Sequence, residues 1–198
     1  MLKTLKQNLN NHFKLKRPVP RRDAILKHAA VLVVVCGARD CLELLLTLRS
    51  NSVSRHRGEV AFPGGMWQEG DADLLVTALR EANEEIGIQA SSLELIATLP
   101  SASPMRNHLT VIPFVAYMED EQKLIAQPSE ISEIFRVPFR YLMDQKNYHY
   151  FEKTFEGQNY RLPYIKYNGH QIWGFTLMVL VELLNVGMAA EIDLNYPF

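Results

Sequence analysis

The chain has 198 residues, of which 47% are apolar and 22% charged, a balance that fits one globular domain with a hydrophobic core. Its formal net charge of −1 excludes an overall attraction to nucleic acid or to an anionic membrane, so a polyanion would need a local patch. We expect a cytoplasmic protein, because the sequence lacks both a run of about 18 apolar residues and the apolar core of a secretion signal. Its two cysteines, Cys36 and Cys41, have no zinc-binding spacing and fit reduced thiols.

The first 23 residues are expected to form an N-terminal extension, followed by a single domain over 24–198. Leu2, Leu5 and Leu9 recur at helical intervals, which predicts a short amphipathic helix. A basic linker that contains prolines follows at 16–23. We expect the helix to pack against the domain in preference to a membrane or a partner.

The next part of the chain predicts a hairpin and a sharp turn. Apolar runs at 28–36 and 41–49 indicate two strands joined by a short turn. A polar and basic loop is expected at 50–61. The sequence FPGG at 62–65 cannot continue a regular element, because it combines a proline with two glycines.

A helix is predicted over 73–86, where leucine, alanine and isoleucine recur every three or four residues. Asp71 or Asp73 can cap its start, and Gly87 stands where a helix commonly ends. The remaining segments are expected to form strands at 93–100, 108–118 and 160–167, an extended piece with a helical turn at 130–143, and a buried helix at 171–187. This content predicts an α+β or α/β sandwich.

The predicted helix carries a cluster of carboxylates. Glu81, Glu84 and Glu85 fall within an arc of roughly 100°, on a face separate from the apolar one. Arg80 lies four residues before Glu84 and can form a salt bridge with it. One arginine cannot neutralise three glutamates, whereas a divalent cation such as Mg²⁺ or Mn²⁺ prefers carboxylate ligands. An ordinary solvated helix face is the alternative.

The turn before the helix suggests what this cation would act on. Gly64 and Gly65 would let backbone N–H groups approach a phosphate closely, although glycines also serve tight turns. A phosphate cradle beside carboxylates fits metal-assisted attack on a phosphoanhydride. One of the glutamates could accept the proton of the attacking water.

The segment GGMWQEGDADLLVTALREANEEIGI resembles the Nudix box, whose core reads R-E-U-x-E-E-x-G-U with U apolar. Residues 80–88 match this core at every fixed position. Upstream, Gly65 and Asp71 each stand one residue earlier than in the general pattern, which leaves the role of Asp71 open. The resemblance implies an α/β/α sandwich with a mixed central sheet. It further implies that Glu81 and Glu85 bind Mg²⁺ or Mn²⁺, and that Glu84 is a further ligand, the base or its partner.

Residues 45–65, LLTLRSNSVSRHRGEVAFPGG, resemble the motif L-L-T-x-R-S-x3-R-x3-G-x3-F-P-G-G of one Nudix subgroup, the coenzyme A pyrophosphatases. The second arginine of the motif is displaced, because Ser54 stands at its position and Arg55 follows it. Segments 130–139 and 172–180 are also similar to the subgroup. The resemblance covers roughly residues 25 to 185, without the N-terminal extension.

Coenzyme A carries a 3′-phosphate besides its pyrophosphate, so an enzyme that binds it needs additional cations. Arginine suits phosphate because its donors form a planar fork. Aromatic residues at 148–151 and Trp173 could stack on adenine, although core packing is the stronger expectation for Trp173. The candidate cationic residues are Arg49, Arg55, His56, Arg57 and Arg106.

These observations predict hydrolysis of the pyrophosphate of coenzyme A or its thioesters, with a small molecule as the binding partner and a homodimer left open. One alternative is a Nudix enzyme for ADP-ribose, NADH or a nucleoside triphosphate. A second is a catalytically silent Nudix module that senses a ligand or binds RNA. The intact glutamates and the net charge near zero disfavour the silent module.

Overall fold

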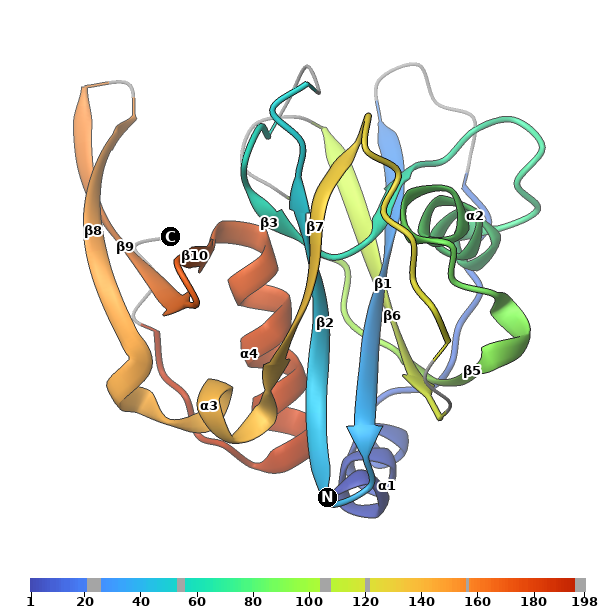
Figure 1. Cartoon of the computed structure of the whole chain (residues 1–198), viewed down its shortest axis with the longest axis horizontal. Helices are drawn as coiled ribbons and strands as arrows, with labels where there is room; N and C mark the ends of the chain where they lie inside the picture. The colour runs from blue at the N-terminus through green and yellow to red at the C-terminus, as the bar shows by residue number, and fades with distance from the viewer. Residues whose placement is uncertain (21–25, 53–55, 104–107, 120–121, 156, 195–198) are drawn as a thin grey trace.

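A seven-stranded mixed sheet forms the centre of the molecule (Figure 1). Its main path runs β3-β2-β1-β6-β5, while β4 pairs with β1 and β7 pairs with β2. Only β1 and β6 pair in parallel among these described strands. The strands are β1 Lys27–Ala38, β2 Cys41–Arg49, β3 Val60–Ala61, β4 Gly64–Met66, β5 Leu93–Thr98, β6 Leu109–Met118 and β7 Ile131–Pro138. The computed structural model describes the whole chain except residues 21–25, 53–55, 104–107, 120–121, 156 and 195–198.

The predicted hairpin of β1 and β2 is confirmed and lies in the middle of this sheet. Leu32 and Val34 of β1 pack into one hydrophobic cluster, and Val33 and Val35 pack into the other. A strand covered on both faces needs a continuous apolar run in place of alternation, which explains the sequence VLVVV. Both cysteines are free thiols, as expected.

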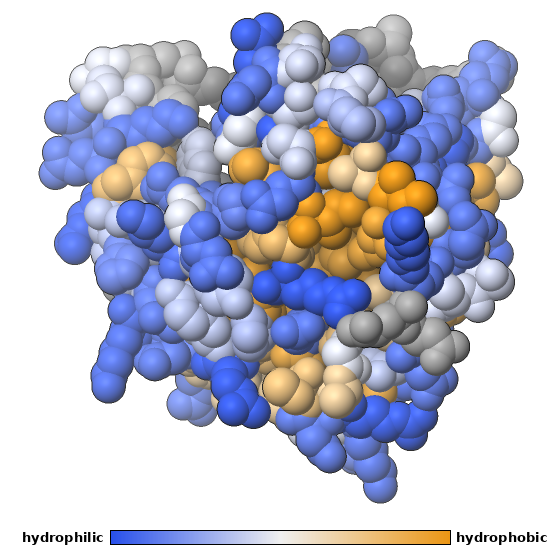
Figure 2. Space-filling model, viewed as in Figure 1, coloured by the Kyte–Doolittle hydropathy of each residue, from blue (hydrophilic) through white to orange (hydrophobic). Residues whose placement is uncertain are grey.

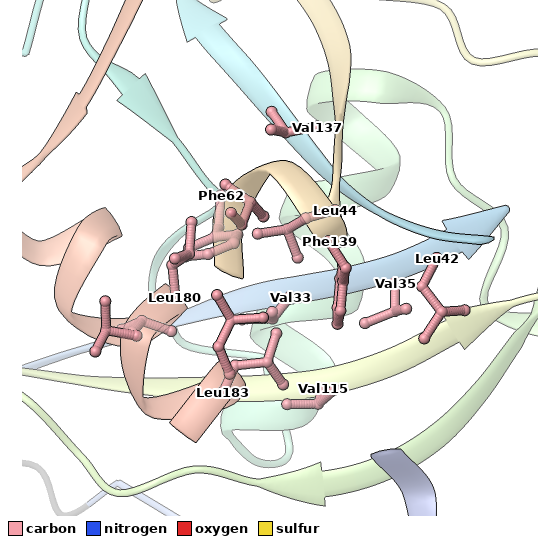
Figure 3. Packing of buried hydrophobic residues seen from close by; sticks show 14 of the residues in the cluster. Val33, Val35, Leu42, Leu44, Phe62, Val115, Val137, Phe139, Leu180 and Leu183 are labelled. Carbon is pink, nitrogen blue, oxygen red and sulfur yellow. The ribbon is translucent and has the colours of Figure 1, made fainter. Parts of the chain in front are cut away.

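Helices cover both faces of the sheet, which gives the expected α/β/α layering (Figure 1). The helix α2 (Leu74–Ile86) packs on one face. On the other face, α4 (Gly174–Met188) and α1 (Leu2–His12) build the larger cluster with the sheet. Figure 3 shows Leu180 and Leu183 of α4 facing Val33 and Phe62 within it. The segment 130–143 contains β7 and the short α3 (Phe139–Met143), as predicted.

A second, three-stranded sheet stands beside α4 (Figure 1); it contains the predicted strand at 160–167 but departs from the prediction at its other two strands. Its strands are β8 Tyr148–Phe155, β9 Gln158–Tyr167 and β10 His170–Trp173. The expected helix over 171–187 therefore begins only at Gly174, and residues 171–173 pair with β9. The reason is the turn at Asn168 and Gly169, both with positive φ, because such a two-residue turn favours a hairpin.

The N-terminal helix α1 is present, and it packs closely on α4. Leu5 and Leu9 are completely buried, and a Cβ atom at Gly187 of α4 would lie 2.4 Å from a methyl group of Leu5. After this helix the chain runs to the start of α2, where Arg17 pairs with Asp73 at 2.9 Å. The extension thus contacts both helical layers, although its treatment as a separate unit stays a prediction.

Hydrophilic side chains cover most of the face in Figure 2, and apolar ones gather near its centre. The large apolar residues that are exposed by more than a third are Leu15, Val19, Leu26, Met66, Ile125 and Met178. Exposed apolar residues of this kind are common on globular proteins. Among the described residues, no helix has the length and apolar character needed to cross a membrane.

Candidate active site

The three predicted glutamates lie on one side of α2 at very different depths. The exposed fraction of the side chain is 56% for Glu84, 18% for Glu81 and 3% for Glu85. The helix is fixed at both ends: Asp73 accepts a hydrogen bond from the Val76 N–H, and Gly87 adopts a left-handed conformation. The apolar face of α2 packs on the sheet, so the carboxylates lie at the edge of that face.

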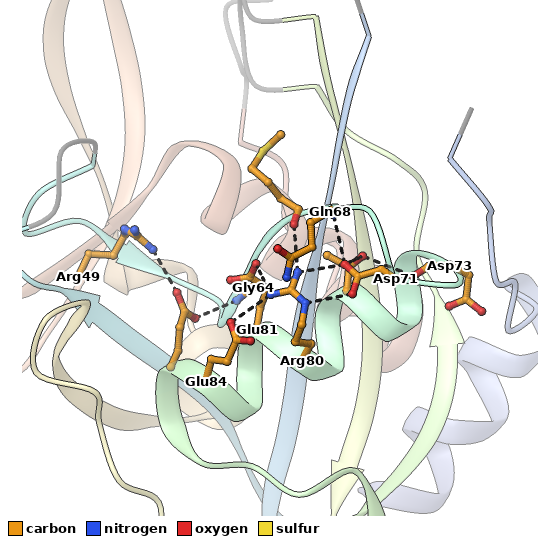
Figure 4. Close-up of polar contacts among 11 residues, drawn as sticks. Arg49, Gly64, Gln68, Asp71, Asp73, Arg80, Glu81 and Glu84 are labelled. Atoms are coloured by element: carbon orange, nitrogen blue, oxygen red, sulfur yellow. Dashed lines mark hydrogen bonds and ion pairs between the residues drawn. The ribbon is translucent and has the colours of Figure 1, made fainter. Parts of the chain in front are cut away.

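Arg80 is the centre of a polar network on this side of α2 (Figure 4). Its guanidinium donates to Glu84 at 3.0 Å, as the four-residue spacing predicted, and to Glu81 at 2.9 Å. It also donates to the Met66 carbonyl at 3.2 Å and twice to Asp71 at 3.0 Å. These contacts orient Glu81 and Glu84, and they raise the pKa of Arg80 far above its usual range.

Asp71 is the anchor of Arg80, a role that the sequence pattern left open. Its carboxylate is buried and also accepts from the Thr77 hydroxyl at 2.9 Å and the Gln68 N–H at 3.3 Å. The hydrogen bonds from Arg80 are the main cause of the lowered pKa of Asp71. The longer loop before α2 therefore still brings an acidic residue onto the arginine.

Glu85 reaches inward from α2 to the sheet. One carboxylate oxygen accepts from the Gly64 N–H at 3.0 Å, and the other faces the Arg49 guanidinium at 3.3 Å. Burial is the main reason that the pKa of Glu85 rises to about 7, and these two donors compensate for it only in part. Glu85 therefore holds a proton more easily than an ordinary glutamate.

The two glycines of β4 allow the closest approaches at this site. A Cβ atom at Gly64 would lie 2.3 Å from the Ala30 carbonyl, and one at Gly65 would lie 2.4 Å from the Glu81 carboxylate. Larger residues would push β4 away from β1 and displace Glu81. Because the Gly64 N–H already donates to Glu85, a phosphate could accept a hydrogen bond from this N–H only after Glu85 moves. Phosphate binding by the two glycines stays a prediction.

A fourth glutamate, Glu130, influences the site from outside α2. Burial is the first cause of the raised pKa of Glu81, and the charges of Glu84 and Glu130 add to it. The charge of Glu130 also contributes to the raised pKa of Glu85. Glu130 directly precedes β7, which pairs with β2. Nothing in the sequence spacing pointed to it, because contacts between distant segments bring it near α2: β7 pairs with β2, and the Gln127 N–H donates to the Glu85 carbonyl at 2.8 Å.

The carboxylate oxygens at this site are the kind of ligand that a hard divalent cation prefers. Glu81 and Glu85 are one helical turn apart, and both have raised pKa values because buried negative charge is incompletely neutralised. In the described part of the chain, however, no three acidic, histidine or cysteine side chains converge into a ready cluster. The carboxylate oxygens of these glutamates accept hydrogen bonds from Arg49 and Arg80 instead. A cation fits this chemistry, provided that an arginine gives way.

One residue of the predicted basic patch contacts a glutamate of α2 in the described part of the chain. Arg49, at the end of β2, contacts Glu85 directly. His56 and Arg57 are exposed in the loop between β2 and β3, where His56 contacts Glu59 at 2.7 Å. Arg55 and Arg106 lie outside the described residues.

The aromatic residues proposed for adenine lie on the small sheet. Trp173 is partly buried, and its ring centroid lies 5.6 Å from that of Phe151. The Lys153 ammonium lies over the Trp173 ring, 4.1 Å from its centroid. Residues 148–151 belong to β8. Packing accounts for these contacts of Trp173, and stacking on adenine stays a prediction.

Comparison with known proteins places this arrangement in a family. The family model of the NUDIX domain matches residues 26–156. The relative named "Uncharacterized Nudix hydrolase NudL" in Photorhabdus laumondii is 35% identical over 176 residues, which cover 87% of this chain and 92% of that protein. The NudL of a Klebsiella pneumoniae strain is 33% identical over 178 residues, covering 89% and 92%.

Solved structures support the same fold. A MutT/nudix family protein from Enterococcus faecalis superposes with a TM-score of 0.52 and 18% identity, over 85% of this chain and 64% of that one. A Deinococcus radiodurans protein gives the same TM-score and identity over 83% and 90%. This chain therefore belongs to the NUDIX family. Its reaction class is the hydrolysis of pyrophosphate-type bonds.

Proposed function

We propose that this protein hydrolyses the pyrophosphate bond of coenzyme A or its acyl thioesters. The products are 3′,5′-ADP and 4′-phosphopantetheine or its acyl form. One observation carries the proposal: Arg49, from the motif that resembles coenzyme A pyrophosphatases, contacts Glu85 of the Nudix helix at 3.3 Å. The segment that would select the substrate and the segment that would perform the reaction thus meet in one contact.

The reaction needs a cation, a water molecule and a proton acceptor. Nudix enzymes generally use divalent metals such as Mg²⁺ or Mn²⁺, and such a cation would polarise the phosphate oxygens when bound. Glu81 and Glu85 are the residues that would hold it. Glu84, the most exposed of the three, would accept the proton of the attacking water, and Arg80 keeps this carboxylate in place. The water oxygen forms the new bond to phosphorus as the phosphoanhydride oxygen leaves.

The basic loop after β2 would supply the specificity. His56 and Arg57 are exposed there and Arg55 stands beside them in the sequence, so these residues can receive the 3′-phosphate of coenzyme A. That phosphate distinguishes coenzyme A from its dephospho form, from ADP-ribose and from NADH.

A substrate panel tests the specificity. We expect faster turnover of coenzyme A than of dephospho-coenzyme A, ADP-ribose, NADH or a nucleoside triphosphate, each assayed with Mn²⁺. Arg55→Ala should raise KM for coenzyme A more than KM for the dephospho form. The exposed Arg39, which pairs with Glu119, provides a control arginine for the same substitution. Equal turnover of both forms by the wild type would contradict the role of the basic loop.

A further inference from the structure

The two arginines that contact the α2 carboxylates differ in how fully their donors are used. Arg80 makes five hydrogen bonds, to three carboxylates and a backbone carbonyl. Arg49 has its single contact with Glu85 at 3.3 Å, and its Nε is buried with no partner among the described residues. Figure 4 shows Arg80 enclosed by acceptors and Arg49 joined to the site by one line. Arg80 is fixed, whereas Arg49 is held weakly.

An unsatisfied buried donor is unfavourable by about 1–3 kcal/mol, so the observed position of Arg49 is not its best one. A phosphate group would satisfy more of its donors, because it accepts the planar fork of an arginine in pairs. The Arg49 side chain is 24% exposed, which leaves it open to a ligand from solvent.

The backbone around Arg49 restricts any movement to the side chain. The Arg49 N–H donates to the Glu59 carbonyl at 3.0 Å, and the Arg49 carbonyl accepts from the Gly58 N–H at 3.2 Å. The next N–H, of Ser50, donates to the Glu130 carbonyl at 2.7 Å. The guanidinium can therefore leave Glu85 by rotation of its own side-chain bonds without a change in β2.

A cation that approaches Glu85 must compete with both of its present partners. The Gly64 N–H belongs to the fixed pairing of β4 with β1, so it cannot easily withdraw. The Arg49 guanidinium is held by one contact at 3.3 Å, and a divalent cation beside it would repel it. Arg49 is therefore the partner that gives way.

We propose that Arg49 is a placeholder cation, which neutralises Glu85 in the metal-free protein and moves to a substrate phosphate when a divalent cation takes Glu85. This positioning role rests on the proposed metal site. It couples metal binding to substrate binding, because Arg49 can contact the substrate phosphate with all its donors only after the metal has bound. It also explains why the glutamates do not form a ready cluster in the described part of the chain.

A double-mutant cycle of binding tests the placeholder role without measuring turnover. Pyrophosphate affinity is measured by calorimetry with a chelator present, for the wild type, Glu85→Gln, Arg49→Met and the double variant. Glu85→Gln should bind pyrophosphate about tenfold more tightly than the wild type, because it releases Arg49. In the Arg49→Met background the same change should have little effect. An equal gain in both backgrounds would mean a general loss of negative charge and would overturn the proposal.

Mn²⁺ binding, measured without chelator, separates this proposal from the metal site itself. Arg49→Met should bind Mn²⁺ several-fold more tightly than the wild type, because the metal no longer displaces a resident charge. Arg39→Ala, far from the site, should leave Mn²⁺ affinity unchanged. If Glu85→Gln keeps wild-type Mn²⁺ affinity, the metal site fails. If that variant loses Mn²⁺ but Arg49→Met gains none, the metal site stands and the placeholder role is wrong.

Discussion

At the scale of single residues, the surroundings of a carboxylate determine the direction in which its pKa shifts. Glu84 and Glu85 are neighbours in the sequence, yet the first is half exposed and held by Arg80, and the second is buried. Burial raises the pKa of Glu85 to about 7, whereas hydrogen bonds from Arg80 lower the pKa of Asp71. The same side-chain group therefore anchors an arginine at one position and holds a proton more easily than an ordinary glutamate at another.

The raised pKa of Glu85 predicts how the stability of the metal-free protein depends on pH. Below its ordinary value of 4.5 both states hold the proton, so there is no penalty. Between 4.5 and about 7 only the unfolded chain has released it, so the free energy of unfolding falls as pH rises. Above about pH 7 the full loss is about 3 kcal/mol. Glu85→Gln should lack this decline.

Urea unfolding with a chelator, repeated from about pH 5 to pH 8, measures this difference between the wild type and Glu85→Gln. The two stability curves should diverge in the variant's favour as pH rises. Parallel curves would show that the Glu85 carboxylate is not desolvated in the fold.

Residues close in sequence were the predictable part of the site. Spacing on one helix was enough for the pair of Arg80 and Glu84, because helical geometry fixes their distance. Asp71 was noticed, but its role depended on the path of a loop. The approach of Arg49 to Glu85, and the influence of Glu130, depend on strand pairing across the sheet. Long-range placement of this kind leaves no periodic signal in one sequence.

At the scale of elements, the strongly periodic segments were predicted well. The helix α2 and the hairpin of β1 and β2 lie where periodicity and turn residues placed them. The prediction was wrong at β10 because QIW joins the helical sequence without a break, while the Asn168–Gly169 turn before it forms a hairpin with β9. Short strands next to long helices are difficult to separate by hydrophobicity alone.

The contact of α1 with α4 gives a prediction at this scale. Gly187→Ala should destabilise the protein by about 1–3 kcal/mol, because its new methyl group would overlap the buried side chain of Leu5. In an exposed helix the same change would stabilise instead. Chemical unfolding measures the change.

The Leu5→Ala variant provides the control. It should be destabilised on its own, since Leu5 is completely buried. In its presence, Gly187→Ala should cost less, because the smaller side chain leaves room. A stabilising effect of Gly187→Ala that simply adds to Leu5→Ala would show that the two helices do not pack here.

At the scale of the whole molecule, the sheet brings together segments that contribute different chemical groups to the site. The helix α2 carries the carboxylates, β4 supplies a fixed N–H donor, and β2 delivers an arginine from the opposite side of Glu85. The NUDIX fold thus explains the reaction class, and the segment from β2 to β4 would determine the substrate. The family was recognised from a sequence motif and the α/β/α layering was implied by that resemblance, whereas the contact between helix and strand required the structure.

The most direct test of this account incubates the purified chain with coenzyme A and Mn²⁺ and separates the products by chromatography. We predict 3′,5′-ADP and 4′-phosphopantetheine from the wild type. Glu85→Gln should keep its fold but lose turnover on the order of a thousandfold, since the metal contributes several kcal/mol to such reactions. Wild-type turnover by that variant, or no release of 3′,5′-ADP by the wild type, would contradict the account.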